Sequence, residues 1–235
     1  MLRAAVWLLV MLLAGCAAPP LSRQQLERIV DDPQRSAADR TNDVRRHPVD
    51  MLSFIGVRPG MRVLDVSAGG GYTTELLARA VGPEGRVYAQ APKPSPRLLE
   101  RTKLLNNIVV VPRPFNDPVP PELKGLDLVT LMFNYHDFGH LGVDRASVNR
   151  AVFNALKPGG FYVIADHAGR PGTGISESGT LHRIEEPFLR SEVEAAGFRL
   201  AEEGTFLRNP NDPRDRETPD PAQPKDEFVL KFVKP

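Results

Sequence analysis

The sequence is poor in residues that mark several common protein classes. Of its 235 residues only one is cysteine, Cys16, and only one is tryptophan. A lone cysteine so close to the amino terminus excludes an internal disulfide framework and thiol chemistry in the rest of the chain. The formal net charge is +1 and the pI is about 7.9. Such a balance creates no bulk field that would attract a polyanion, so no nucleic-acid partner is predicted.

Long apolar runs are also scarce, and the one that is present lies at the start. Residues 4–14 follow a single positive charge, Arg3, and are too short to span a bilayer comfortably. They lead into Leu-Ala-Gly-Cys at positions 13–16, which resembles the lipobox of bacterial lipoproteins. The resemblance implies cleavage before Cys16 and lipidation of its thiol. With Ala17 next, it also implies a protein of the cell envelope, lipid-anchored on the periplasmic face of the outer membrane.

The chain is therefore expected to have three parts. Residues 1–15 are interpreted as a lipoprotein signal peptide, 16–35 as a tether and N-terminal segment, and 36–235 as one domain. The length and a hydrophobic content of 41% suit a single globular core.

Within that domain, short apolar runs alternate with segments of helical spacing. Five such runs, at 62–66, 86–90, 108–111, 126–133 and 161–165, predict strands, and the segments between most of them predict helices. The runs at 198–206 and 228–233 predict a final antiparallel pair. Strands that alternate with helices indicate a doubly wound, Rossmann-like α/β sheet of seven mostly parallel strands with an antiparallel C-terminal hairpin.

One stretch, Arg62–Tyr72, is central to this pattern. A short apolar strand ends in Ser67, Ala68 and three glycines, after which helical spacing begins. Glycines at such a turn let the backbone approach a ligand, and the following helix offers unpaired N–H groups. In open α/β sheets ligands bind beyond the carboxyl ends of the strands, so this turn is the predicted binding site. A tight turn that binds nothing is the alternative.

The residues from Asp65 to Gly71 resemble motif I of class I S-adenosylmethionine-dependent methyltransferases. Leu126–Phe133 is similar to motif IV of that family, and Leu156–Ile164 is similar to the segment that enters its fifth strand. The combination of residues 69–77 with Asn-Tyr-His-Asp at 134–137 also resembles a group of exported methyltransferase-like proteins of unassigned substrate.

This resemblance implies S-adenosylmethionine as the cofactor and assigns residues to it. The implied cofactor-binding residues are Asp65, Ala68, Gly69, Gly70, Gly71, Gln90 and Asn134. Three of the family's features are absent. Ser67 replaces the first glycine of the motif, and Gln90 stands where an acidic residue usually binds the ribose hydroxyls. Arg113 and Phe115 occupy the region of the family's adenine-binding pair, where Phe115 is a candidate to pack on the adenine.

Polar side chains follow two neighbouring predicted strands. His136 and Asp137 come after the fourth, and Asp166 and His167 end the fifth. Because these ends should meet at one edge of the sheet, His136, Asp137 and His167 are the candidate catalytic residues. His182, at the end of a glycine-rich loop, is a candidate to fold over them.

Two chemistries suit such a cluster. A histidine held by a carboxylate can act as a general base near neutral pH. The same side chains could instead bind a divalent metal, although their spacing fits no zinc signature and no metal site is assigned. Purely structural hydrogen bonding is the third possibility.

The sequence thus predicts a membrane-anchored enzyme that transfers a methyl group from S-adenosylmethionine to an unidentified small-molecule acceptor. A non-catalytic, ligand-binding lipoprotein with the same fold is the alternative.

Overall fold

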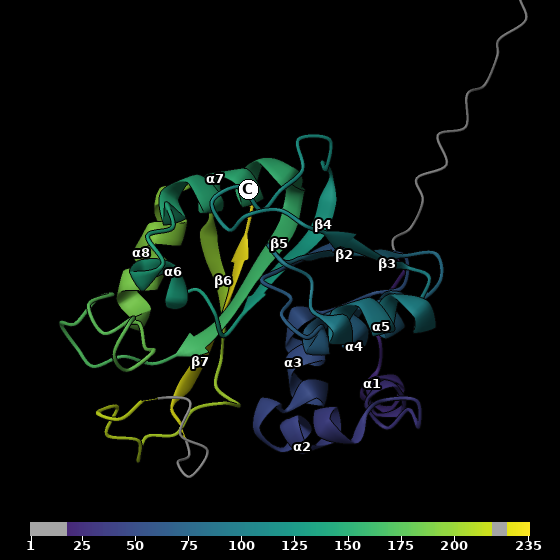
Figure 1. The fold of residues 1–235 in the computed structure, drawn as a ribbon, viewed down its shortest axis with the longest axis horizontal. Coiled ribbons are helices and arrows are strands. Elements are labelled where there is room, and N and C mark those ends of the chain that lie inside the picture. Colours follow the sequence, from purple (N-terminus) through teal and green to yellow (C-terminus); the bar gives the residue numbers. More distant parts are fainter. Residues whose placement is uncertain (1–17, 218–224) are drawn as a thin grey trace, which may run out of the picture.

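The computed structural model describes residues 18–217 and 225–235, which form one α/β unit built on a central sheet (Figure 1). The helices are α1 (Arg23–Val30), α2 (Ala37–Arg46), α3 (Pro48–Ile55), α4 (Tyr72–Val81), α5 (Pro96–Leu104), α6 (Asp137–His140), α7 (Arg145–Ala155) and α8 (Glu186–Ala195). The strands are β1 (Arg62–Val66), β2 (Arg86–Gln90), β3 (Ile108–Val111), β4 (Leu126–Met132), β5 (Leu156–His167), β6 (Arg199–Gly204) and β7 (Glu227–Val233).

The seven strands lie in the order β3-β2-β1-β4-β5-β7-β6. The first five are parallel to one another, while β7 runs antiparallel to both β5 and β6. The predicted doubly wound sheet with an antiparallel C-terminal hairpin is therefore confirmed. Strand order reverses beside β1, so the carboxyl ends of β1 and β4 border the crevice in which ligands of such sheets bind.

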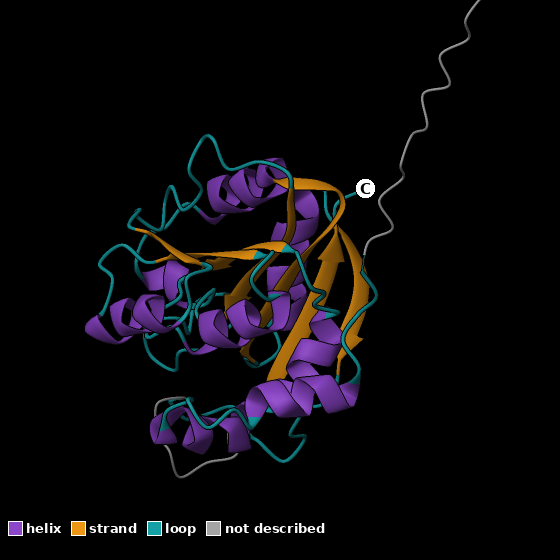
Figure 2. Cartoon of the chain, turned by 90° about the vertical axis from the view of Figure 1, so that its right-hand side faces the viewer, coloured by secondary structure: helices purple, strands orange, loops and turns teal. Residues whose placement is uncertain are grey.

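Helices cover both faces of the sheet, as the side view shows (Figure 2). Buried side chains of α1, α3, α4 and α5 form one core, and those of α6, α7 and α8 belong to the other. The alternation of side chains along β1 supplies both cores, because Val63 faces the first and Leu64 and Val66 face the second.

Buried ion pairs attach the N-terminal helices to this core. Arg101 of α5 donates to Asp39 of α2 at 2.7 Å, and it also pairs with Glu75 of α4. All three side chains are buried. Removing one member of such a buried pair typically costs about 3–5 kcal/mol, so these contacts fix α2 beside the start of α4.

The second half of β5 follows the prediction, but its beginning does not. The strand was predicted at 161–165, whereas β5 begins at Leu156 and includes Lys157–Gly160. The pairing with β4 shifts register between Leu126 and Leu128, and this irregularity absorbs the extra residues.

No helix among the described residues is long and apolar enough to cross a bilayer. The predicted signal peptide and Cys16 lie outside the described residues. Part of the segment 16–35 is α1, whose Leu26 and Val30 are buried in the core.

Candidate functional site

The turn between β1 and α4 has the backbone that the sequence predicts. Gly69 and Gly71 have left-handed φ values of 55° and 78°, and Gly71 begins α4 without any side-chain cap. The first N–H groups of an α-helix have no partner within the helix. Gly71 has no side chain to cap them, so those other than the Thr74 N–H, which bonds the Asp65 carboxylate, can serve a ligand, with the positive end of the helix dipole behind them.

Ser67 adopts the left-handed conformation that glycine has in the motif it resembles. Its φ is 57°, and its hydroxyl donates a 2.5 Å hydrogen bond to Oδ1 of Asn134. The amide nitrogen of Asn134 in turn donates to Oδ2 of Asp137 at 2.5 Å. The departure from glycine thus preserves the turn and connects it to the end of β4.

Asp65 supports the turn from below rather than facing outward. The carboxylate is 2% exposed and accepts hydrogen bonds from Thr74 of α4 at 2.6 Å and Thr130 of β4 at 2.8 Å. Burial raises the pKa of Asp65 to about 6, against the opposing effect of the two threonine hydroxyls. Through these two bonds Asp65 of β1 connects β4 and α4 beneath the turn.

Gln90 is fully buried, and both ends of its amide are used within the protein. Its Oε1 accepts from the Ser67 N–H at 2.8 Å, and its Nε2 donates to the carbonyl of Arg113 at 2.7 Å. Ala68 donates its N–H to the Gln90 carbonyl at 2.8 Å. Gln90 therefore braces the turn and offers no free amide to ribose hydroxyls. Phe115, the candidate for adenine packing, contacts Phe138 instead, with 5.3 Å between ring centroids.

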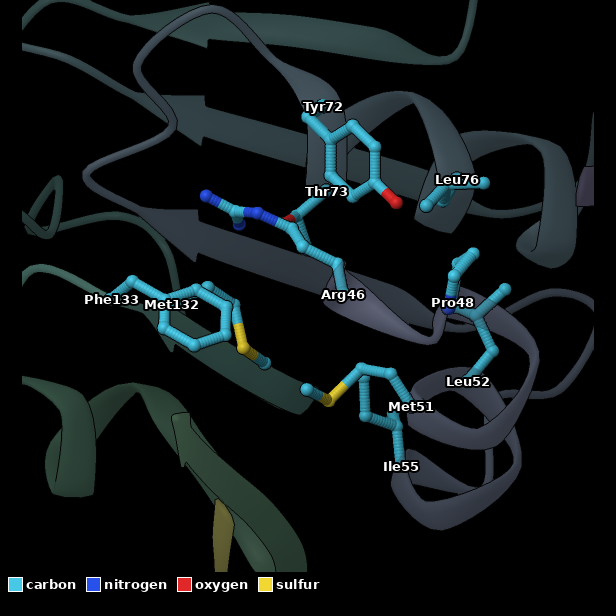
Figure 3. A pocket seen from close by; sticks show the side chains of 10 residues that line it. All are labelled: Arg46, Pro48, Met51, Leu52, Ile55, Tyr72, Thr73, Leu76, Met132 and Phe133. Atoms are coloured by element: carbon cyan, nitrogen blue, oxygen red, sulfur yellow. The ribbon is translucent and has the colours of Figure 1, made fainter. Parts of the chain in front are cut away.

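Arg46, at the end of α2, completes this edge and was not singled out by the sequence. Its guanidinium lies 4.5 Å from the ring centroid of Phe133 and 5.2 Å from that of Tyr72. Figure 3 shows the side chain passing between these two rings. Nε is buried and has no hydrogen-bond partner among the described residues. Burial, with a contribution from the neighbouring Arg45, lowers the pKa of Arg46 to about 10, so it is charged at neutral pH.

Arg46 borders a narrow cavity of about 20 Å³ between α3, the first turn of α4 and the end of β4 (Figure 3). A buried cation next to uncapped helix N–H groups is complementary to a carboxylate. The amino-acid end of S-adenosylmethionine carries such a carboxylate, so Arg46 and the start of α4 fit that cofactor, while the cavity itself is lined almost entirely by apolar groups and has room for about one water molecule.

The predicted catalytic side chains do come together. Nδ1 of His136 lies 2.6 Å from Oδ1 of Asp166, and Nε2 lies 3.0 Å from Oδ1 of Asp137. His182 reaches the same Asp137 oxygen through Nδ1 at 2.9 Å. The ring of His167 lies 5.4 Å from that of His136. We refer to His136, Asp137, Asp166, His167 and His182 as the histidine cluster.

The two histidines predicted as bases differ in their surroundings. Burial alone would lower the pKa of His136, but the carboxylates of Asp166 and Asp137 raise it to about 10. His167 is also buried, and burial lowers its pKa despite Oε1 of Glu227 at 3.0 Å from Nδ1. That contact is an electrostatic one without hydrogen-bond alignment, since Nδ1 has no hydrogen-bond partner among the described residues.

His136 therefore has a carboxylate against each ring nitrogen, whereas His167 has one only at Nδ1 among the residues that the structure describes. A base must present an unprotonated nitrogen within reach of the substrate proton. Of the two histidines, His167 meets this requirement better.

Comparison with known proteins agrees with this fold. Residues 24–102 match the family described as Protein-L-isoaspartate(D-aspartate) O-methyltransferase (PCMT). Over 117 residues the chain is 33% identical to the ubiquinone/menaquinone biosynthesis C-methyltransferase UbiE of Burkholderia multivorans. That match covers 49% of this chain and 46% of the relative, so the chain spans about half the length of the curated relatives it matches.

Solved structures extend the similarity to almost the whole chain. A SAM-dependent methyltransferase from Aquifex aeolicus superposes with a TM-score of 0.64 at 19% identity, covering 92% of this chain and 100% of that one. Fibrillarin from Aeropyrum pernix, solved with natively bound S-adenosyl-L-methionine, gives 0.52 at 21% identity, covering 75% and 68%. The resemblance to class I methyltransferases is confirmed, and their fold is the fold of this chain.

Proposed function

We propose that this chain, which has the class I S-adenosylmethionine-dependent methyltransferase fold, binds S-adenosylmethionine at the β1–α4 turn and transfers its methyl group to a small-molecule acceptor. The observation that carries the proposal is the buried, unpartnered Nε of Arg46 beside the uncapped start of α4. The sequence similarity to O- and C-methyltransferases supports the same activity.

The residues around the turn would divide the work of binding. Arg46 would hold the carboxylate of the cofactor, and the N–H groups at the start of α4 would add hydrogen bonds to it. Asn134 would border the cofactor from the end of β4, since its Oδ1 already accepts a bond from Ser67 of the turn. When bound, S-adenosylmethionine supplies an activated methyl group on a sulfonium.

On the acceptor side, the chain's own residues would handle position and proton. Methyl transfer needs alignment of the nucleophile with the methyl–sulfur bond, and removal of a proton where the nucleophile carries one. His167 would accept that proton at Nε2, and Glu227 would stabilise the imidazolium through Nδ1. His136, with a carboxylate against each ring nitrogen, would hold Asp137 and Asp166 in place rather than act as the base.

Calorimetric titration with S-adenosylmethionine and S-adenosylhomocysteine tests the proposal. The unaltered protein should bind both with micromolar or tighter affinity. Arg46→Gln should weaken binding by about 10- to 100-fold, because a hydrogen bond to a charged group contributes about 1.5–3 kcal/mol. Arg150→Gln, which removes an exposed arginine on α7, should leave binding unchanged. Absence of binding heat at millimolar ligand would contradict the proposal. It would favour the alternative, a non-catalytic protein of the same fold that binds another small molecule.

We also propose that the domain is attached to the membrane through lipidated Cys16, on the periplasmic face of the outer membrane. The support for this attachment is the lipobox-like sequence at positions 13–16. Metabolic labelling with a radioactive fatty acid should mark the protein but not its Cys16→Ser variant. Label retained in that variant would contradict the anchor.

A further inference from the structure

We propose that the histidine cluster binds a divalent transition-metal ion through Nε2 of His136, Oδ1 of Asp137 and Nδ1 of His182. This site goes beyond methyl transfer and does not depend on it. The three atoms lie within 4.8 Å of one another, and the carboxylate oxygen is 3.0 Å and 2.9 Å from the two ring nitrogens. Ligand atoms bonded to one zinc-sized ion at about 2.0–2.2 Å are separated by about 3–3.5 Å, so little movement is needed. The ion takes the place of the proton between Nε2 of His136 and Asp137, and that proton is released to solvent.

Two of the three ligands are already oriented by neighbouring side chains. Asp166 is fully buried and holds Nδ1 of His136 at 2.6 Å, while its other oxygen accepts the His136 N–H at 2.8 Å. This arrangement turns Nε2 toward Asp137. A carboxylate on the far nitrogen of a ligating histidine is the usual support of a metal site.

Asp137 is held in a similar way. Asn134 donates to Oδ2 at 2.5 Å, so Oδ1 is the oxygen that faces both histidines. Asp137 follows His136 directly at the start of α6, whereas His182 comes from the distant 169–185 loop. At His182 the backbone is left-handed, with φ of 51°, a conformation that a non-glycine residue adopts at some cost.

The site is closed on one side and open on the other. His136 is 3% exposed, whereas the side chains of Asp137 and His182 are 22% and 28% exposed. Three protein ligands leave coordination positions for water or an oxygen of a bound molecule, as in catalytic rather than structural zinc sites.

The donor set also selects the kind of ion. Two imidazoles and one carboxylate suit zinc, iron(II) and other first-row divalent ions, whereas magnesium and calcium prefer oxygen ligands throughout. Glu217 adds negative charge near the opening, with Oε1 3.7 Å from Nε2 of His182. His140 is not counted as a ligand because its Nδ1 lies 3.0 Å from the hydroxyl of Ser178.

The test uses the full chain, purified without a polyhistidine tag and stripped with a chelator. Titration with Zn²⁺ should show one tight equivalent, and Co²⁺ should give visible absorption bands of a coordination number below six. Asp137→Asn and His182→Gln should each weaken Zn²⁺ affinity by at least about tenfold and reduce the Co²⁺ bands. Far-UV circular dichroism checks that each variant is folded. The side chain of His182 is partly exposed, so His182→Gln should fold. This variant alone can decide the test if Asp137→Asn does not fold.

His47→Gln is the matched control, because Nδ1 of His47 lies 3.7 Å from Asp50 in a separate histidine–carboxylate pair. It should leave Zn²⁺ binding and the Co²⁺ spectrum unchanged. The proposal is overturned if the unaltered protein takes up no Zn²⁺. It is equally overturned if folded His182→Gln binds as tightly as the unaltered protein, which would mean adventitious binding elsewhere. Titration with S-adenosylmethionine is scored separately, so failure of either proposal is distinguishable.

Discussion

Replacing Gly71 by alanine should strongly destabilise the protein, for two separable reasons. Its φ of 78° is left-handed, which costs an alanine about 1–2 kcal/mol. A Cβ there would also lie 2.7 Å from Cδ of Arg101 and 2.9 Å from Cδ1 of Leu98. Such overpacking typically costs a further 1–3 kcal/mol, so the free energy of unfolding should fall by about 2–5 kcal/mol.

Arg101 cannot simply swing aside to make room. Its Nε donates to the Gly70 carbonyl at 2.8 Å, and its remaining nitrogens pair with Asp39 and Glu75. Relieving the clash would therefore break at least one buried contact.

Gly60→Ala is the matched control for the backbone cost alone. Gly60 has a similar φ of 81°, but nothing lies within 4 Å of a Cβ built there. Urea unfolding of both variants should show that Gly71→Ala loses about 1–3 kcal/mol more than Gly60→Ala. Equal losses would refute the argument that α5 packs rigidly against the turn.

Substitutions at two further positions, Asp65 and Ser67, test this turn. The pKa of Asp65 is about 6 in the folded chain, above its value in the unfolded chain. Between about pH 4 and 6 the folded state therefore binds more protons than the unfolded state. As a result, the contribution of Asp65 to the free energy of unfolding falls as pH rises through that window. Urea unfolding from pH 4 to 7 measures this fall in the free energy of unfolding, and Asp65→Asn should make it smaller by about 2–3 kcal/mol. If the variant shows the same dependence of unfolding free energy on pH as the unaltered protein, the burial of the charge is contradicted. Ser67→Ala keeps the left-handed strain and loses the bond to Asn134, so it should cost about 1 kcal/mol. Ser67→Gly also loses that bond but relieves the strain, and its thermal unfolding should be close to that of the unaltered protein. Identical midpoints for the two Ser67 variants would exclude strain at this position.

The sequence was sufficient for the parts of the fold that depend on neighbouring residues. The apolar strand, the glycine turn and the helix after it are encoded within Arg62–Val81, and all three form as predicted. The four-residue helix α6 was missed because so short a segment carries no readable period.

Contacts between distant segments were harder to predict. Gln90 was assigned to the ribose through the family resemblance, which gives no sign that its amide bonds Ser67 and the Arg113 carbonyl, 23 residues away on either side. Arg46 ends a charged helix and gives no local sign that Phe133 and Tyr72 will cover it.

The hydrogen-bonded line from Ser67 through Asn134 to Asp137 has a thermodynamic consequence. It joins the proposed cofactor site to the proposed metal site through only two side-chain hydrogen bonds. A ligand that shifts Asn134 at one end changes the free energy of binding at the other. Such coupling is reciprocal, so whatever factor a bound ion applies to cofactor affinity, the cofactor must apply equally to the affinity for the ion.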